Sequence, residues 1–242
     1  MASACCEKAG KPVVHEYKSV GVTEKSIDNM DVYVTGSGTS AVIFIYDIFG
    51  LKFNQVNQVA DRIAASAGVV VAVPDVFLGQ PWPMEKMPPK PEDNLMGWIS
   101  TAGSWDAVSK YLNATVDMLK GKGVTKFGVF GFCWGASIAM TAGKDTAYSF
   151  VGGAHPSFFG KTKEFSEPVQ VPVILISCKE DPMEEVKEVT DKKPFASKCF
   201  YQRFDDQVHG FLGARGDYKD ASVASRAGEA IEVIANFVKT SF

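Results

Sequence analysis

The chain has 242 residues, of which 46% are hydrophobic and 22% are charged, with a formal net charge of −3 at pH 7. This composition predicts a globular protein with a sizeable core and excludes a long disordered or fibrous chain. The slightly acidic balance and the lack of a basic run favour neither nucleic acid nor a membrane surface as a partner. No apolar stretch reaches the roughly 20 residues that a membrane helix needs, and residues 1–12 lack the apolar core of a secretory signal.

In chain order, the first predicted elements are an antiparallel edge pair made of residues 13–20 and 30–34. A continuous apolar run at residues 41–47 then predicts a strand buried on both faces. Residues 53–68 carry apolar side chains at helical spacing, and residues 69–75 repeat the pattern of a buried strand. Residues 79–98 hold five prolines and two tryptophans, which we interpret as a long insert rather than a domain linker.

The alternation of strand and helix continues to the C-terminus. Helices are predicted around residues 108–119 and 222–239. Further strands are predicted at residues 126–130, 148–154, 171–178 and 199–204. Alternating buried strands and helices predict an α/β fold with a mostly parallel central sheet and helices on both faces. We expect one domain over residues 1–242, with its functional residues in the loops that follow the strands.

The five cysteines show no regular spacing. This pattern is typical of free thiols in a reducing compartment, so we expect a cytoplasmic protein. We interpret the vicinal Cys5 and Cys6 as thiols of a frayed terminus, with metal binding or oxidation as the alternative. No metal-ligand spacing and no glycine-rich phosphate or dinucleotide motif occurs, so the sequence predicts no metal and no cofactor.

The segment Gly131-Phe132-Cys133-Trp134-Gly135 stands between a predicted strand and a helix-forming stretch. The related pattern G-x-S-x-G forms a sharp turn that presents a nucleophile, and its glycines leave room where strand and helix meet. A helix N-terminus favours a thiolate at Cys133 and aims the backbone N–H of Trp134 at a developing oxyanion. The alternative is that Cys133 is a small apolar core residue.

A thiol nucleophile needs a histidine, and the histidine needs an orienting acid. Asp181 follows the fifth of the buried strands, and His209 follows the sixth. Taken alone, His209 also fits a solvated loop histidine, and Asp181 a turn residue before Pro182. The chain order Cys133, Asp181, His209 is that of nucleophile, acid and base in α/β-hydrolases, which favours a catalytic triad.

Six segments share the sequence patterns of one known family. They are YDIFG (46–50), VPDVFLGQPWP (73–83), GFCWGA (131–136), GAHPSF (153–158), CKEDPM (178–183) and DQVHGF (206–211). On these segments the chain resembles the dienelactone hydrolase family, in its eukaryotic fungal and plant-type branch. The resemblance implies a carboxymethylenebutenolidase-like ester hydrolase that cleaves small esters or lactones through Cys133, with Asp181 as acid and His209 as base. We expect a second oxyanion-binding N–H near Ile48.

The same resemblance implies auxiliary roles. Asp47 matches a glutamate that holds the thiol in the bacterial enzymes until substrate arrives. Those enzymes also bind a substrate carboxylate through two arginines. Here Gly79 occupies one of these positions, and Arg215 is the nearest counterpart of the other. At least half of the carboxylate clamp is therefore missing, which disfavours dienelactone itself as the substrate.

Further residues are candidates for substrate contacts. His155 follows the fourth buried strand and either contacts substrate or hydrogen-bonds a neighbouring loop. Trp82, Trp98 and Phe211 are candidates for lining an apolar pocket, although a tryptophan in such an insert also packs the insert down. We expect a small-molecule substrate, and the chain to be a monomer or a homodimer.

Three alternatives stay open. A class I glutaminase would carry its acid two residues after the histidine, where Phe211 stands. A silent member of the fold would bind a ligand without turning it over. A thioesterase or a glucan-directed hydrolase would use the same fold on a different bond.

Overall fold

A computed structural model describes residues 11–242 of the protein, so Cys5 and Cys6 lie outside the described residues. Its centre is an eight-stranded sheet in the order β1-β2-β4-β3-β5-β6-β7-β8. The strands are β1 (Val22–Lys25), β2 (Asp31–Thr35), β3 (Ser40–Ile45), β4 (Val70–Pro74), β5 (Lys126–Phe132), β6 (Tyr148–Ala154), β7 (Val173–Cys178) and β8 (Phe200–Phe204). The first two strands pair antiparallel, β2 runs antiparallel to β4, and the remaining pairs are parallel.

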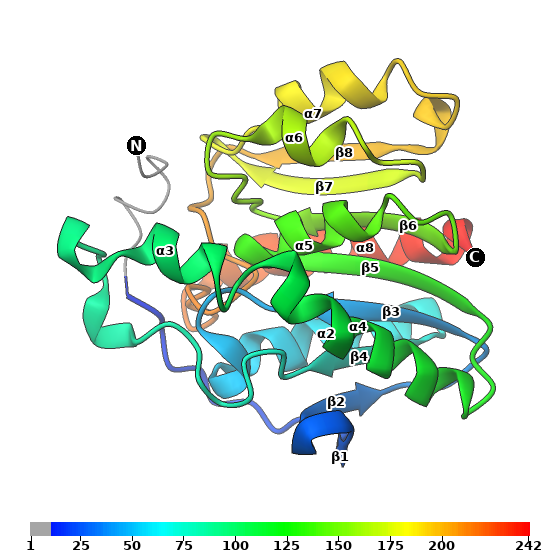
Figure 1. Ribbon diagram of the computed structural model, residues 1–242, viewed down its shortest axis with the longest axis horizontal. Helices are drawn as coiled ribbons and strands as arrows, with labels where there is room; N and C mark the ends of the chain where they lie inside the picture. Colours follow the sequence, from blue (N-terminus) through cyan, green and yellow to red (C-terminus); the bar gives the residue numbers. More distant parts are fainter. Residues whose placement is uncertain (1–10) are drawn as a thin grey trace.

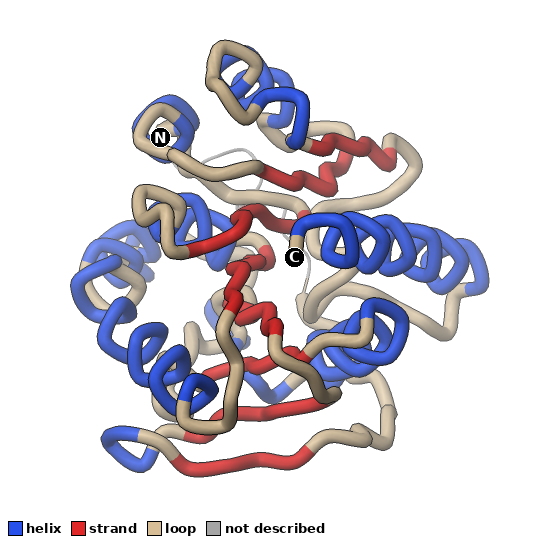
Figure 2. Tube along the Cα trace, turned by 90° about the vertical axis from the view of Figure 1, so that its right-hand side faces the viewer, coloured by secondary structure: helices blue, strands red, loops and turns tan. Residues whose placement is uncertain are grey.

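Helices cover both faces of this sheet (Figures 1 and 2). They are α2 (Asn54–Ala67), α3 (Leu95–Ser100), α4 (Trp105–Lys120), α5 (Trp134–Ala142), α6 (Thr162–Ser166), α7 (Met183–Thr190) and α8 (Ala221–Ser241). In Figure 1, α4 and α5 lie in front of the sheet, whereas α2 and α8 pack against each other behind it. The predicted α/β fold with helices on both faces is therefore confirmed.

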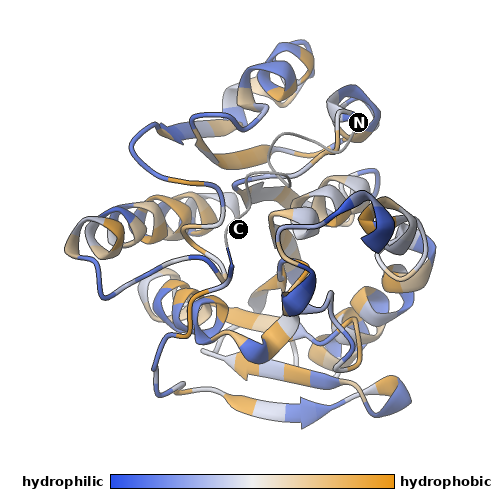
Figure 3. Ribbon diagram, turned by 90° about the vertical axis from the view of Figure 1, so that its left-hand side faces the viewer, coloured by the Kyte–Doolittle hydropathy of each residue, from blue (hydrophilic) through white to orange (hydrophobic). Residues whose placement is uncertain are grey.

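The core follows from the composition of the strands. Residues 41–45 of β3 are all fully buried, as expected for a strand that has helices on both of its faces. Figure 3 shows the hydrophobic residues concentrated on the strands and on the sides of the helices that face them. The parallel strands all point their carboxyl ends to one edge of the sheet, and at that edge such folds place their sites. Among the described residues, no helix has the length and apolar character needed to cross a membrane.

The predicted strand at residues 13–20 is wrong. Residues 11–20 form no regular secondary structure, and the strand that pairs with β2 is β1. The segment lies along α2 instead: the Gln55 side chain donates to the Val13 carbonyl at 2.8 Å, and the Tyr17 hydroxyl donates to Asp61 at 2.9 Å. Its alternating pattern therefore reflects half-burial against helix α2 and not pairing in the sheet.

The proline-rich insert is packed onto the body of the fold. Trp82 is only 3% exposed, and its ring lies edge-on to Trp98 at 5.6 Å between centroids. Trp98 in turn packs on Phe77 at 4.8 Å, and Phe77 packs on Trp134 at 4.8 Å. The insert ends in α3, a helix that was not predicted from the sequence. This row of aromatic rings connects it to the first residue of α5.

Candidate active site

Cys133 occupies a sharp turn between β5 and α5, called the elbow below. Its backbone has φ 53° and ψ −115°, a conformation that side-chain-bearing residues seldom adopt. The glycines two residues before and after Cys133 are required because there is no room for a side chain at either position. A Cβ added to Gly131 would lie 2.0 Å from the Gly135 backbone, and one added to Gly135 would lie 2.2 Å from the Ile45 carbonyl oxygen. The strand and helix therefore approach too closely for any larger residue, and Cys133 projects from the turn.

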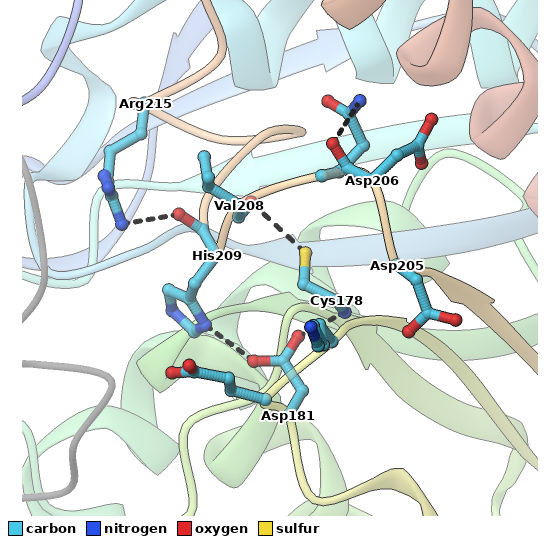
Figure 4. A pocket seen from close by; sticks show the side chains of 10 residues that line it. Cys178, Asp181, Asp205, Asp206, Val208, His209 and Arg215 are labelled. Carbon is cyan, nitrogen blue, oxygen red and sulfur yellow. Dashed lines mark hydrogen bonds and ion pairs between the residues drawn. The ribbon is translucent and has the colours of Figure 1, made fainter.

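Asp181 and His209 form a hydrogen-bonded pair at the carboxyl edge of the sheet (Figure 4). The His209 Nδ1 lies 2.9 Å from Asp181 Oδ1, and the other carboxylate oxygen accepts the Cys178 backbone N–H at 2.6 Å. Both oxygens are therefore held, and the Asp181 side chain is only 2% exposed. With Nδ1 facing the carboxylate, Nε2 is the ring nitrogen left for proton exchange with the nucleophile.

The charges around His209 favour its protonated form. Burial lowers the pKa of His209, but the negative charges of Cys133 and Asp181, together with the hydrogen bond from the ring to Asp181, raise it to about 10. The structure thus brings Cys133, Asp181 and His209 together, from three different strand ends. An imidazolium beside a thiolate is the arrangement that activates cysteine nucleophiles.

The expected oxyanion donors belong to the residue that follows Cys133 and to the turn after β3. Trp134 is the first residue of α5, so its N–H has no carbonyl one turn earlier to donate to. Its side chain is fully buried and donates from Nε1 to the Gly103 carbonyl at 2.9 Å. Ile48 lies in the turn after β3, where its carbonyl accepts the Trp82 N–H at 2.8 Å. The hydrogen bond to Trp82 ties this turn to the insert.

Asp47 holds the backbone of two loops together. One of its carboxylate oxygens accepts the Phe49 N–H and the other the Ala214 N–H, both at 2.9 Å. Burial raises the pKa of Asp47, and these two hydrogen bonds and the charge of His209 oppose that shift. The carboxylate is therefore engaged with main-chain donors in this structure rather than with the Cys133 thiol.

His155 packs directly against the base. Its ring is fully buried, with its centroid 5.2 Å from that of His209, and neither ring nitrogen has a hydrogen-bond partner among the described residues. Burial lowers the pKa of His155 well below its usual value, as do the charges of His209 and Arg215, so the ring is neutral. Within residues 11–242, His155 therefore lacks the hydrogen bond to a neighbouring loop that the sequence suggested. The ring also has no exposed surface with which to touch a substrate.

The apolar pocket expected between Trp82, Trp98 and Phe211 is not assembled. Phe211 is fully buried and packs on Phe204 at 5.5 Å, since the loop after β8 folds inward. Trp82 and Trp98 border a separate surface hollow of about 680 Å³ within the insert. The three rings therefore serve the core and the packing of the insert.

A pocket of about 320 Å³ opens beside Asp181 and His209 (Figure 4). Arg215 stands on its wall and donates from Nη1 to the His209 carbonyl at 2.7 Å, so this guanidinium fixes the loop that carries the base. Gly79, where an arginine was expected from the bacterial pattern, offers no charge, and its N–H donates to Asp75 at 2.7 Å. Within residues 11–242, no cluster of three His, Cys, Asp or Glu side chains could hold a metal ion.

The structure adds Ser157, which was not predicted from the sequence as a site residue. Its hydroxyl lies 3.4 Å from Cys133 Sγ and 3.5 Å from His209 Nε2. The residue belongs to the segment GAHPSF, which was quoted for the resemblance, but a serine in a loop carries no signal of its own. Only the fold shows that this loop reaches the elbow.

Comparisons with known proteins agree with this arrangement. A family model described as the dienelactone hydrolase family matches residues 30–242. The chain is 31% identical to an uncharacterized AIM2 family protein of Schizosaccharomyces pombe over 99% of both chains. It is 30% identical to a carboxymethylenebutenolidase homolog of Xenopus tropicalis, over 84% of this chain and 83% of that protein.

A solved structure of a dienelactone hydrolase from Anabaena variabilis superposes with a TM-score of 0.60 at 15% identity, covering 90% of this chain and 97% of that one. At this low identity the likeness shows the α/β-hydrolase fold alone. The family model and the sequence relatives go further, since they span most of the chain, including the elbow and both members of the acid–base pair. The chain therefore belongs to the dienelactone hydrolase family.

Proposed function

We propose that the protein is a cysteine-dependent hydrolase of small esters or lactones, acting through Cys133, His209 and Asp181. The observation that supports this most is the strained elbow at Cys133, which faces a histidine that is held by a buried carboxylate 2.9 Å away. Backbone strain is maintained where the surrounding structure compensates for it, and such sites are often functional. The family relationship supports hydrolase activity, and the arrangement of Cys133, His209 and Asp181 supports the proposed mechanism.

In the proposed reaction, the Cys133 thiolate attacks the carbonyl carbon of the ester. The negative charge passes to the carbonyl oxygen, where the N–H groups of Trp134 and Ile48 stabilise it. The tetrahedral intermediate then collapses to a thioester, and His209 gives its proton to the departing alcohol. A water molecule, deprotonated by His209, attacks the thioester and releases the acid and the free thiol.

The nucleophile narrows the class of substrate. A thiolate is a good nucleophile at neutral pH but also a good leaving group, so the intermediate returns to substrate when the alcohol or amine is a poor leaving group. We therefore propose activated esters, enol lactones and thioesters as substrates in preference to amides. Gly79 brings no charge to the site, so of the two arginines of the bacterial carboxylate clamp only the one matched by Arg215 has a counterpart in this chain.

Hydrolysis of p-nitrophenyl esters from acetate to octanoate tests this proposal. We expect Cys133→Ala to lose activity by about 10³-fold or more, because the remaining groups cannot form a covalent intermediate. Cys199→Ala is the matched control, since Cys199 is another half-buried free thiol, located directly before β8 and away from the elbow. Equal rates in wild type and Cys133→Ala would refute the nucleophile. Activity in neither protein would favour a silent, ligand-binding member of the fold.

A further inference from the structure

The turn after β6 inserts one hydroxyl between the nucleophile and the base. Ser157 Oγ lies 3.4 Å from Cys133 Sγ and 3.5 Å from His209 Nε2. The hydroxyl thus lies within reach of both partners of the proposed ion pair. A serine hydroxyl suits this place, since one oxygen can donate to the sulfur and accept from the ring N–H at the same time. Hydrogen bonds of catalytic groups are often long in a free enzyme and shorten once the substrate is bound.

The main chain fixes this hydroxyl in position. The Cys133 N–H donates to the Ala154 carbonyl at 3.1 Å, and the Ser157 N–H donates back to the Cys133 carbonyl at 3.0 Å. Between these two bonds, His155 has φ 39° and donates its N–H to the Ile176 carbonyl at 2.6 Å. A buried, non-glycine residue in the left-handed region is costly, and such strain concentrates at functional sites. The turn is therefore locked to the elbow by its backbone, whatever the side chain of residue 157.

We propose that Ser157 is a further catalytic residue, whose hydroxyl holds the thiolate and the imidazolium together as an ion pair. This inference rests on the proposed function of Cys133 and His209. The hydroxyl donates its hydrogen bond to the Cys133 sulfur and accepts one from the N–H at His209 Nε2. No bond breaks in this role, so the hydroxyl leaves the reaction unchanged. When the sulfur becomes a thioester, the hydroxyl remains next to Nε2 and keeps the ring aimed at the elbow.

Burial excludes a role for Ser157 as a second nucleophile. Ser157 is 2% exposed, whereas Cys133 is half-buried and projects from the elbow. The sulfur is therefore the more accessible of the two groups, and the buried hydroxyl acts as a support and not as a second nucleophile.

The charges that surround His209 come from several elements. Cys133 faces it from the elbow, Asp181 from the end of β7, and the neutral ring of His155 from the end of β6. Asp47 faces it from the turn after β3, and Arg215 binds its carbonyl. Removing the Ser157 oxygen leaves all of these groups in place, so a change in pH dependence would report on the hydroxyl itself.

The test is Ser157→Ala, with Ser137→Ala as its matched control. Ser137 is a buried serine on α5, close behind the elbow, whose hydroxyl donates to the Trp134 carbonyl at 2.7 Å. Each substitution deletes one buried oxygen, and Ser157→Ala keeps the backbone bond to Cys133. A hydrogen bond to a charged group typically changes an equilibrium by about 10- to 100-fold. We therefore expect kcat/KM for p-nitrophenyl acetate to fall by about that factor in Ser157→Ala and to stay within about twofold in Ser137→Ala.

The decisive measurement is the rate at which iodoacetamide labels Cys133 as a function of pH. The labelling of Cys133 is identified as the kinetic phase that is missing in Cys133→Ala. Loss of the hydroxyl should move its midpoint upward by about one to two pH units, which corresponds to the same factor. An unchanged midpoint would overturn the proposal, including when kcat/KM falls, because a merely structural defect does not shift the ion-pair equilibrium.

Further variants distinguish a failure of the role proposed for Ser157 from a failure of the nucleophile proposed at Cys133. If Ser157→Ala does not fold, Ser157→Thr keeps the hydroxyl and should retain the wild-type midpoint. A Ser157→Thr protein that folds with a raised midpoint would also overturn the proposal. Full activity in Cys133→Ala would instead refute the nucleophile, and with it the pair that Ser157 is said to hold. Loss of activity in Cys133→Ala beside wild-type behaviour in Ser157→Ala would refute only the role of Ser157.

Discussion

Replacing Asp181 by asparagine probes the acid–base pair with almost no change in shape. The two carboxylate oxygens of Asp181 accept different N–H groups, one on the His209 ring at 2.9 Å and one on the Cys178 backbone at 2.6 Å. An asparagine side chain has a single oxygen, so it can satisfy only one of them. Because the Cys178 N–H belongs to the main chain and is buried, we expect the amide oxygen to stay there and the NH₂ group to face His209.

The size of the effect follows from these contacts. Losing one hydrogen bond to a charged group costs about 1.5–3 kcal/mol, or about 10- to 100-fold in rate. An amide NH₂ also favours the ring tautomer with the proton on the wrong nitrogen, and in Ser-His-Asp enzymes the same substitution lowers kcat by about 10⁴-fold. We therefore expect kcat for Asp181→Asn to fall by about 10²- to 10⁴-fold.

We also expect Asp181→Asn to change the pH profile of activity. The pKa of His209 is raised to about 10 in part by Asp181, so the alkaline limb of activity should lie near pH 10 and shift to lower pH in Asp181→Asn. The assay is kcat for p-nitrophenyl acetate between pH 6 and 10.5. Asp191→Asn, at an exposed aspartate paired with Lys187, is the control and should match wild type. A loss of less than about tenfold in Asp181→Asn, with an unmoved alkaline limb, would refute the assigned role.

Other predictions concern the fold around the site. Gly135→Ala should lower the free energy of unfolding by about 1–3 kcal/mol in urea, because its Cβ would lie 2.2 Å from the Ile45 carbonyl oxygen; unchanged stability would contradict the close approach. Tyr33→Phe should cost about 1.5–3 kcal/mol in the same assay, since its hydroxyl donates to the buried Asp61 carboxylate at 2.6 Å; a neutral result would show that this anchor is dispensable. Burial lowers the pKa of His155, so below about pH 6.5 the folded state binds fewer protons than the unfolded state and stability should fall as pH decreases. In His155→Gln this pH dependence of the free energy of unfolding, about 1.4 kcal/mol per pH unit, should be missing. An equal change of the free energy of unfolding with pH in wild type and variant would contradict the lowered pKa of His155.

Much of the fold could be predicted because β3 to β7 are almost entirely buried. Such strands appear in the sequence as continuous apolar runs, and their ends, together with that of the half-buried edge strand β8, mark the edge where Cys133, Asp181 and His209 meet. The segment at residues 13–20 misled the prediction because alternation reports half-burial, whether the partner is a strand or, as here, helix α2. Helix α7 was not predicted, since its eight residues bury only Met183, Val186 and Thr190.

The finer features of the site could not be predicted from the sequence, for a different reason. Ser157 contacts residues 24 and 52 positions away in the chain, and no local pattern encodes a contact of that kind. The burial of His155 and Phe211 likewise depends on how the loop after β8 folds back over the sheet edge. Residue type and position after a strand identify candidates, but the direction of each side chain is set by tertiary packing.

The proposed reaction requires Cys133 to form a thioester with the substrate. Rapid acid quenching of the reaction with p-nitrophenyl acetate, followed by intact mass measurement and peptide mapping, tests it most directly. We expect an acetyl group on the peptide that contains Cys133, formed within the first turnover and released by neutral hydroxylamine. An active enzyme with no acyl group on Cys133, or with the acyl group on another residue, would contradict it.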